Sequence, residues 1–356
     1  MAGRFRPAGK GKRPAEMEFD KGQLLKSIPH PRYNRSLATL PATIPPPDPL
    51  SPYLAEAETY IRRAKADNTV KAYRSDWARF ETFCRGREVA CLPAAPATVA
   101  AYAADAARTL KANTIDRHLT AISQAHQLAS VANPVEDKLV RTVMAGIRRV
   151  KGTAQRGKEP LSPELLRQMF AGTPDGLRAR RDRALLLVGF AGAFRRSELV
   201  ALRCEDVRFA EEGLVATIPK SKTDPEGAGQ TVGIPYGSHP ESCPVRALET
   251  WLERSRITGG YLFRAIGRWG GEAAARPLCD HQLAKIVKRL AARAGLDPAA
   301  FSGHSLRSGL ATSAAEGGAS ERAIMEQTRH RSLKQVRKYI RRGSLFQDNA
   351  AARSGL

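Results

Sequence analysis

The sequence predicts a mainly α-helical protein of two domains with one small antiparallel β-sheet. The chain has 356 residues, which is more than one ordinary domain holds. Apolar residues recur at helical spacing along most of it, and β-forming residues alternate or cluster only between about 207 and 235. Hydrophobic residues make up 42% of the chain, which is enough for packed cores.

Residues 1–49 are expected to form a disordered, basic N-terminal tail. They are rich in Gly, Pro and charge, lack a sustained apolar period, and end in a cluster of prolines. The first thirteen residues hold five basic side chains and no acidic one. Two interpretations stay open: a solvated tail, or a basic arm that contacts phosphates.

Residues 50–150 are expected to form a helical domain. One helix should cover about 68–85, capped by Asn68 or Thr69, and an Ala-rich helix is expected near 97–109. Three apolar stripes at helical spacing should supply its core. They are Val70, Tyr73, Trp77, Phe80 and Phe83; Ile115, Leu119, Ile122 and Leu128; and Val135, Leu139, Val143 and Ile147.

A polar, Gly-containing linker is expected at 151–160, followed by a second domain at 161–356. Ser162 and Pro163 have the residue types that cap and begin a helix. Strands are expected at 207–210, 214–219 and 231–235, paired as one antiparallel sheet. Further helices should lie at about 243–255, 280–294, 305–316, 320–328 and 332–342.

The charge balance predicts a polyanionic partner. Lys and Arg number 58 against 35 Asp and Glu, which gives a net charge of +23 and a pI near 10.3. No apolar run approaches the roughly eighteen residues of a membrane span, and the N-terminus has no apolar signal segment. Nucleic acid is therefore favoured over a membrane as the partner.

The five cysteines predict neither a zinc site nor a disulfide framework. They are scattered and form no CxxC pair, so reduced thiols in a cytoplasmic protein are expected. The sequence also has no HExxH motif, acidic triad or Gly-rich phosphate loop, so no metal or other cofactor is expected.

Six side chains of the second domain form an ordered set that could transfer a phosphoryl group to a tyrosine. They are Arg195, Lys222, His304, Arg307, His330 and Tyr339. Glu198 stands three residues after Arg195, and Tyr339 stands nine residues after His330. In order and spacing, this set resembles the active site of the tyrosine recombinases, and the resemblance covers roughly residues 55–350.

The resemblance implies a site-specific recombinase that cleaves and rejoins duplex DNA through a 3′-phosphotyrosine, without a metal. It also implies a two-domain, C-shaped DNA clamp, in which a SAM-like core-binding domain precedes an α+β catalytic domain. A monomer or weak dimer would become a homo-tetramer on two synapsed sites and exchange strands through a Holliday junction.

Tyr339 would be the nucleophile. Its phenol must lose its proton as it attacks phosphorus. Arg195 and Arg307 are the expected phosphate clamp, since a guanidinium stays charged and offers paired donors to non-bridging oxygens. Arg196 competes with Arg195, but only Arg195 stands three residues before Glu198, whose carboxylate can hold it.

His304 would share one helical face with Arg307 and serve as the proton-transfer group. His330 would contact the scissile phosphate. The residue before it departs from the family pattern, because Arg329 stands where Gly is common. Gly permits positive φ more readily than Arg, so the local turn is expected to differ.

Lys222, where the second strand should leave the sheet, would protonate the departing 5′-oxygen, with Lys220 as the competing lysine. Side chains expected to contact DNA are Lys71, Arg74, Arg79, Lys111, Arg117, Lys138, Arg141 and Lys220. After the nucleophile helix, Leu345 and Phe346 suit a segment that docks on a neighbouring protomer, or that packs within its own chain.

Two other functions share some of these features. A type IB topoisomerase uses the same chemistry to relax supercoils as a monomer. A DNA-binding accessory protein could keep the fold without catalysis, although all six catalytic positions carry chemically suitable residues here. The target sequence and the direction of recombination cannot be predicted from the residues.

Overall fold

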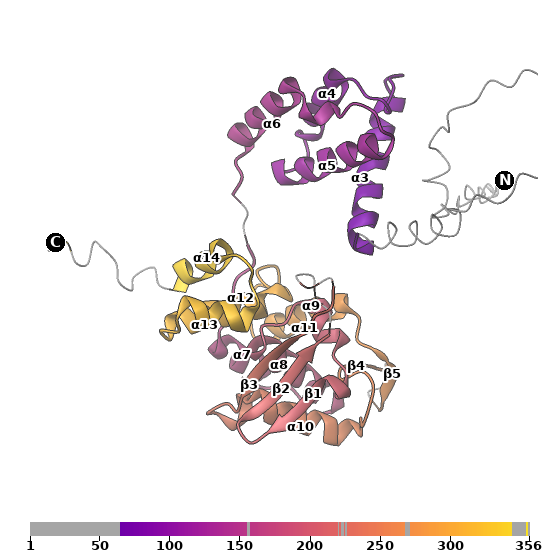
Figure 1. Cartoon of the computed structure of the whole chain (residues 1–356). Coiled ribbons are helices and arrows are strands. Elements are labelled where there is room, and N and C mark those ends of the chain that lie inside the picture. The colour runs from indigo at the N-terminus through magenta and orange to yellow at the C-terminus, as the bar shows by residue number, and fades with distance from the viewer. Residues whose placement is uncertain are drawn as a thin grey trace, which may run out of the picture. The chain divides into compact units, whose positions relative to one another are not determined.

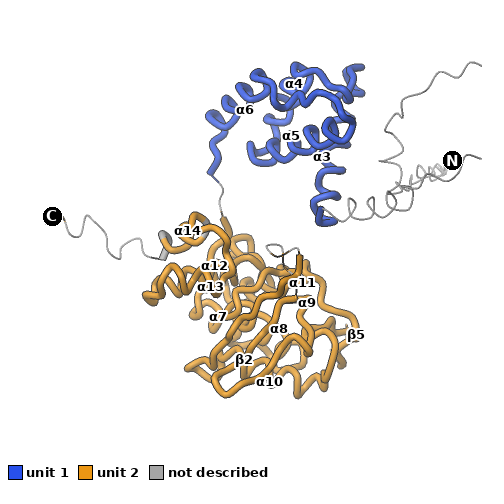
Figure 2. The backbone as a smooth tube through the Cα atoms, viewed as in Figure 1, with its two compact units in different colours: residues 1–155 blue, residues 156–356 orange. Residues whose placement is uncertain are grey.

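The computed structural model describes residues 65–154, 157–219, 221, 224, 226–267, 271–343 and 354. The chain divides into two compact units between Gln155 and Arg156, shown in different colours in Figure 2. The expected N-terminal tail, both candidate acid lysines (Lys220 and Lys222), and Leu345 and Phe346 lie outside the described residues.

The first unit is helical, as predicted. From residue 65 onward, its α-helices are α3 (Asp67–Arg85), α4 (Pro96–Ala106), α5 (Ala112–Leu128) and α6 (Lys138–Lys151), labelled in Figure 1. Phe80, Ile115 and Ile122 are completely buried at the centre of this unit. The capping prediction, Asn68 or Thr69, was two or three residues late, because α3 begins at Asp67 and Ala66 is its N-cap.

Four side chains of the predicted stripes do not belong to the core, and Tyr73 is the one of them that is half-buried. Val70, Leu128 and Leu139 are exposed. In α6 the buried residues are Val140 and Met144, one position later than the predicted Leu139 and Val143. A helix turns about 100° per residue, so an error of one position rotates the predicted face by that angle.

In the described part of the second unit, ten α-helices and strands precede the last three helices. They are α7 (Pro163–Phe170), α8 (Leu177–Ala191), α9 (Arg196–Ala201), β1 (Val207–Ala210), β2 (Gly213–Ile218), β3 (Gln230–Pro235), α10 (Pro244–Ser255), β4 (Arg264–Ile266), β5 (Ala273–Pro277) and α11 (Asp280–Arg293). The predicted start of α7 is confirmed, because the Ser162 side chain accepts a hydrogen bond from the Leu165 backbone N–H at 3.2 Å.

The predicted three-stranded sheet is confirmed in its pairing. Its order is β1-β2-β3, both pairs are antiparallel, and Leu214 lies opposite Ile234. Leu214, Ile234 and Val232 are buried, so one face of the sheet covers the core. A second hairpin, β4 with β5, was not predicted. Its strands, Arg-Ala-Ile and Ala-Ala-Ala-Arg-Pro, carry almost no β-forming residues.

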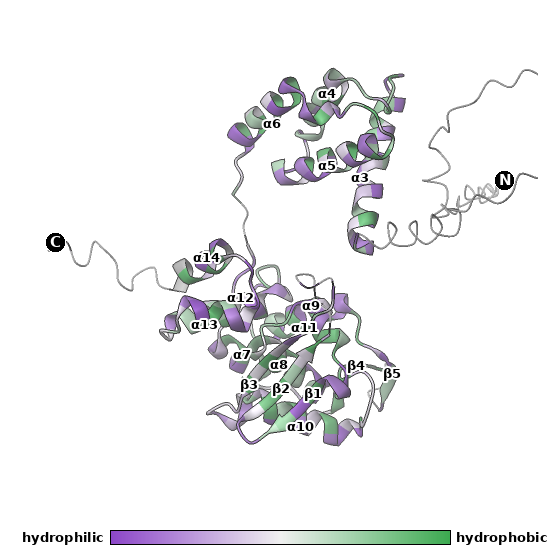
Figure 3. Cartoon of the chain, in the orientation of Figure 1, coloured by the Kyte–Doolittle hydropathy of each residue, from purple (hydrophilic) through white to green (hydrophobic). Residues whose placement is uncertain are grey.

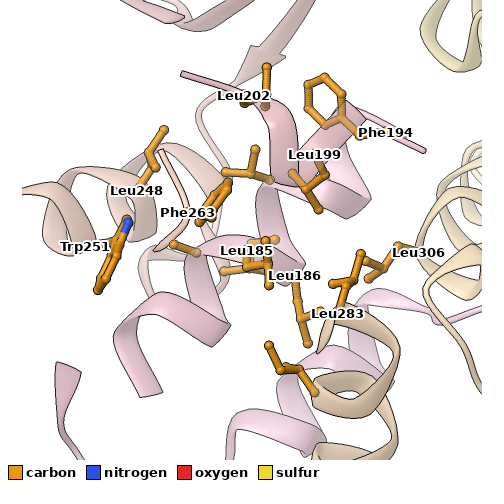
Figure 4. Close-up of a cluster of buried hydrophobic side chains, with 14 of the residues drawn as sticks. Leu185, Leu186, Phe194, Leu199, Leu202, Leu248, Trp251, Phe263, Leu283 and Leu306 are labelled. Atoms are coloured by element: carbon orange, nitrogen blue, oxygen red, sulfur yellow. The ribbon is translucent and has the colours of Figure 1, made fainter. Parts of the chain in front are cut away.

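Helix α8 runs through the middle of the second unit. Leu185 and Leu186, close together in Figure 4, are both fully buried, because α8 is covered by apolar side chains on more than one face. Figure 3 shows the hydrophobic colour on α8 and on the strands beside it. Trp251 of α10 is also fully buried, and its indole N–H donates to the Leu262 carbonyl at 2.9 Å.

The last three helices, α12 (His304–Glu316), α13 (Glu321–Thr328) and α14 (Leu333–Gly343), pack together (Figure 1). Ala311, Ala315, Ile324 and Val336 form their shared apolar cluster. Leu333, the first residue of α14, is exposed. Helix α12 also packs against α8, so residues from the middle of the chain meet residues near its end.

Candidate active site

Arg195 stands immediately before α9, in the turn that follows α8. Its Nη1 donates to Glu198 Oε1 at 2.5 Å, and its backbone N–H donates to Glu198 Oε2 at 2.9 Å. Burial alone would raise the pKa of Glu198, but these hydrogen bonds and the charges of Arg195 and Arg329 outweigh it and lower that pKa. Glu198 is therefore an ionised carboxylate that holds Arg195, as the spacing in the sequence predicted.

Arg196 lies on a different side of the α8–α9 turn. Its Nη2 is 3.6 Å from Asp280 Oδ2, at the start of α11. The aliphatic part of its side chain packs against Gly303. The structure thus separates the two neighbouring arginines, with Arg195 on Glu198 and Arg196 on Asp280.

Arg307 reaches the same region from α12, with only 2% of its surface exposed. Its Nη1 donates to the Ala193 carbonyl at 2.7 Å, and its Nη2 donates to the Thr328 carbonyl. Burial, aided by the positive charges of Arg195 and Arg329, lowers the pKa of Arg307 to about 9. That value is above neutral pH, so the guanidinium is still positively charged.

His304 and Tyr339 are in direct contact. His304 Nε2 and Tyr339 Oη are 2.8 Å apart, which joins the first turn of α12 to α14. His304 keeps an exposed edge, yet the atoms around it remove water from much of the ring. This desolvation, with Arg307, Arg195 and Lys338, lowers the pKa of His304 below its ordinary value. A neutral imidazole with a free lone pair can accept the phenol proton.

His330 also lies close to the tyrosine. The centres of the His330 and Tyr339 rings are 5.8 Å apart, and His330 Nδ1 is 2.6 Å from Thr328 Oγ1. Desolvation, then the charges of Arg307 and Arg195, lower the pKa of His330 to about 4. His330 is thus neutral at physiological pH and can act as a hydrogen-bond donor.

The expectation that the turn before His330 would differ from a glycine turn was wrong. Arg329 adopts the left-handed conformation, with φ 54° and ψ 42°, and ends α13 as a glycine would. Its side chain is buried and donates to the carbonyls of Gly192 and Ala193 and to Glu198. Contacts of the side chain can offset the strain of this backbone conformation.

The candidate DNA-contacting side chains that the structure describes are all exposed. They are Lys71, Arg74, Arg79, Lys111, Arg117, Lys138 and Arg141. Arg117 has a second task, because its guanidinium makes two hydrogen bonds, at 2.6 and 2.9 Å, to the carboxylate of buried Asp76. His118, which is buried beside this pair, contacts Asp76 at 3.2 Å and the Tyr102 hydroxyl at 2.7 Å. No single-sequence signal distinguishes this network from a solvated helix face.

No helix among the described residues is long and apolar enough to cross a bilayer. Within the same residues, no three His, Cys, Asp or Glu side chains gather closely enough to hold a metal ion. The groups that do converge are two arginines, two neutral histidines and a tyrosine. Together they offer a nucleophile, a proton acceptor and positive charge for a phosphate.

Fold and site together define a class of enzyme that breaks a phosphodiester with a tyrosine. The sequence pattern of the Phage integrase family matches residues 159–344, and that of the phage integrase N-terminal SAM-like domain matches residues 57–132. The chain belongs to this family of tyrosine recombinases. It is therefore a site-specific recombinase that cleaves and rejoins DNA through a phosphotyrosine intermediate.

Individual relatives agree with this membership. An integrase/recombinase xerD homolog of Selenomonas ruminantium is 45% identical over 304 residues, which is 84% of this chain and 88% of the relative. Recombinase cre of Escherichia phage P1 is 25% identical over 303 residues, which is 79% of this chain and 85% of the relative.

Solved structures share the fold. The Tn1549 transposon integrase in complex with transposon right end DNA has a TM-score of 0.59 at 15% identity, covering 80% of this chain and 92% of that one. XerH recombinase bound to a palindromic difH substrate has a TM-score of 0.56 at 18% identity, covering 72% of each chain. The predicted fold class, mainly α-helical with a small antiparallel sheet, is confirmed.

Proposed function

We propose that Tyr339 is the nucleophile of DNA cleavage and that His304 accepts its proton. The observation that carries this proposal is the 2.8 Å contact between His304 Nε2 and Tyr339 Oη. Nucleophile and base are thus within hydrogen-bond reach of each other. The lowered pKa of His304 keeps the imidazole neutral, which is the form that takes a proton.

In the cleavage step, Tyr339 Oη attacks the scissile phosphorus and its proton passes to His304. A bond forms between Oη and phosphorus, and the bond from phosphorus to the 5′-oxygen breaks. The 3′-phosphate stays on the tyrosine as a phosphodiester, so rejoining needs no external energy source. The 5′-oxygen leaves as a hydroxyl after it receives a proton, for which Lys222 is the proposed donor.

Arg195 and Arg307 stabilise the charge that grows on the non-bridging oxygens during this step. Both guanidiniums are preorganised by protein contacts, Arg195 by Glu198 and Arg307 by the carbonyls of Ala193 and Thr328. Fixed charges need little reorganisation as the transition state forms, which is why they lower its free energy. His330 adds a hydrogen bond to the same phosphate.

The proposed domain roles follow from charge and from the site. Residues 50–150 act as the core-binding domain and present the exposed basic side chains to DNA, and residues 161–356 carry the catalysis. The two close around duplex DNA as a clamp in the cytoplasm. The linker at 151–160 joins them, although Glu159 already donates its backbone N–H to the Ala300 carbonyl at 2.9 Å.

Four protomers assemble on two synapsed sites, and the segment after Arg342 couples them. This proposal rests on the family and on the apolar pair Leu345 and Phe346. Truncation after Arg342 should leave binding to a single half-site intact and abolish cooperative assembly on paired half-sites. Normal assembly by the truncated protein would place the coupling elsewhere.

The nucleophile is tested with nicked DNA substrates drawn from the flanks of the encoding gene. Wild-type protein should form a covalent adduct that resists SDS and ends in a 3′-phosphate. Tyr339→Phe should bind the same DNA and form no adduct. Tyr236→Phe is the matched control, because Tyr236 lies on the same unit with its hydroxyl 3.1 Å from Glu249. An adduct with Tyr339→Phe would exclude Tyr339 as the nucleophile.

A further inference from the structure

Arg329 combines two features that are individually costly. It takes a left-handed backbone conformation that non-glycine residues adopt at a cost of about 1 kcal/mol or more. It also buries its guanidinium: the side chain is 4% exposed, and its Nε has no hydrogen-bond partner among the described residues. Glycine at this position would avoid both free-energy costs. The presence of arginine is therefore explained only if its side chain stabilises another part of the molecule.

The buried guanidinium binds the turn that carries Arg195. Nη1 donates to the Gly192 carbonyl at 2.9 Å and Nη2 to the Ala193 carbonyl at 3.0 Å, both just before Arg195. Nη2 also lies 3.2 Å from Glu198 Oε2, just after it. Three contacts thus fix the backbone on one side of Arg195 and the carboxylate that orients its side chain on the other.

The same contacts reach the second arginine. The Ala193 carbonyl that accepts from Arg329 also accepts from Arg307 Nη1 at 2.7 Å. Ala193 itself has a positive φ of 45°, so this turn is strained and needs partners to hold its shape. The guanidinium of Arg329 additionally lies over the Phe194 ring, 5.2 Å from its centre. One side chain is therefore shared by the supports of both arginines.

The charge balance strengthens this interpretation. Three guanidiniums, those of Arg195, Arg307 and Arg329, surround one buried carboxylate, Glu198. With a single arginine as partner, a buried carboxylate would hold that arginine more tightly in an ion pair. A second cation on Glu198 shares its negative charge and leaves more of the positive charge of Arg195 for a phosphate.

We propose that Arg329 is a positioning residue for DNA cleavage, which holds the Gly192–Arg195 turn and Glu198 so that Arg195 and Arg307 meet one phosphate. It does not touch the reacting atoms. This inference rests on the proposed roles of Arg195, Arg307 and Tyr339. A substitution of Arg329 should change the rate at which DNA-bound enzyme cleaves, because the geometry of the transition-state contacts depends on Arg329.

Two substitutions test this without forcing the backbone. Arg329→Gly relieves the left-handed conformation, and Arg329→Asn also tolerates it. Each variant is mixed with saturating nicked DNA, and formation of the Tyr339 adduct is followed over a single turnover. The rate constant should fall about 10- to 100-fold. The final amount of adduct and the DNA dissociation constant should stay close to wild type.

Arg322→Ala is the matched control. Arg322 lies on the same helix and loses the same charge, but its side chain is 88% exposed and pairs with Glu326 at 2.9 Å. It should cleave at the wild-type rate. Unchanged rate constants in both Arg329 variants would overturn the inference. So would a loss confined to the final amount of adduct, because that pattern means fewer folded molecules.

The same experiment distinguishes a failure of the proposed catalytic roles from a failure of the proposed positioning role of Arg329. If wild-type protein forms no adduct, or if Tyr339→Phe still forms one, the proposed catalytic roles fail. If wild-type protein cleaves at Tyr339 and the Arg329 variants cleave equally fast, only the positioning role of Arg329 fails.

Discussion

At the scale of the residue, the proposed role of His304 as proton acceptor means that its charge state should set the pH range in which the enzyme cleaves DNA. Burial, Arg307, Arg195 and Lys338 lower the pKa of His304, so its proton-accepting form persists below the ordinary histidine range. We expect the single-turnover cleavage rate to rise with pH and to level off at a lower pH than a histidine of ordinary pKa would allow. His304→Gln should slow cleavage about 100- to 10,000-fold and abolish this rise.

His281→Gln is the control for that measurement. The His281 side chain is 78% exposed on α11, so its loss should change neither the rate nor its pH profile. A wild-type rate that still rises steeply above pH 7 would show that a group other than neutral His304 takes the proton.

Lys222 allows a chemical test of the departing oxygen. If it protonates the 5′-oxygen, Lys222→Ala should cleave ordinary DNA slowly and recover on DNA with a 5′-bridging sulfur, because a thiolate leaves without prior protonation. The readout is the adduct rate on the two substrates. Lys220→Ala is the comparison: recovery of that variant instead would move the role to Lys220, and recovery of neither would remove it from this loop.

The residues that the sequence identified are those with a distinctive chemistry at a fixed local spacing. Arg195 and Glu198, three apart, pair on the first turn of α9. Arg329 was missed as a functional side chain, since its partners Gly192 and Ala193 lie far away along the chain. The signal in the sequence is an arginine at a position where glycine is common. It predicts a change in the backbone turn, but it does not predict which residues the side chain contacts.

At the scale of the element, sequence patterns predicted that the helices and the three-stranded sheet exist. They were less reliable in predicting which faces of the helices are exposed. The sheet is specified by β-formers around a turn, and it forms at Val207–Ala210, Gly213–Ile218 and Gln230–Pro235. Hairpin β4–β5 has no such pattern. It is held by contacts with residues far away along the chain, such as Arg181 of α8, whose Nη1 donates to the Arg264 carbonyl at 3.2 Å.

Helix α12 depends on a close approach that glycine permits. A Cβ on Gly309 would lie 2.0 Å from the Leu161 carbonyl oxygen, where the segment entering the second unit crosses the helix. The Leu161 backbone N–H donates to the Ser305 carbonyl at 3.0 Å, so this segment has little freedom to retreat. We expect Gly309→Ala to lower the free energy of unfolding by about 1–3 kcal/mol in denaturant titrations.

Gly146→Ala is the matched control on α6. A Cβ there meets nothing within 4 Å, so the substitution should stabilise the helix by about 0.5–1 kcal/mol. Equal effects of the two substitutions would show that the contact with Leu161 is not what requires glycine at position 309.

At the scale of the whole molecule, membership of the family explains why motifs in a fixed order along the chain predicted its function. This holds although the two units differ greatly from each other. The proposed catalytic side chains lie on the turn before α9, on α12, between α13 and α14, and on α14, and the packing of α12 against α8 and α14 brings these elements together. Spacing along the chain cannot encode that convergence. The resemblance to the family predicted this convergence of side chains, and the contacts of Arg307 with Ala193 and Thr328 are its physical basis.

The net charge of +23 predicts how DNA binding responds to salt. Each phosphate contact releases counterions, so log affinity should fall linearly with log salt, by about 0.9 per contact. Removing an exposed charge that serves only DNA should lower this slope by about 0.9 and leave stability unchanged. Arg74→Ala on α3 is such a variant, because Arg74 is exposed.

Arg117→Ala should behave differently, although Arg117 is also an exposed arginine of the first unit. Its guanidinium neutralises the buried carboxylate of Asp76, and its removal leaves that charge with His118, whose pKa burial lowers. We therefore expect Arg117→Ala to lower the free energy of unfolding by about 2 kcal/mol or more. Fluorescence titrations with DNA at several salt concentrations, together with denaturant unfolding, separate the two effects. A nearly flat salt response of the wild-type protein would contradict a phosphate grip, and a stability loss in Arg74→Ala equal to that in Arg117→Ala would contradict the distinction between them.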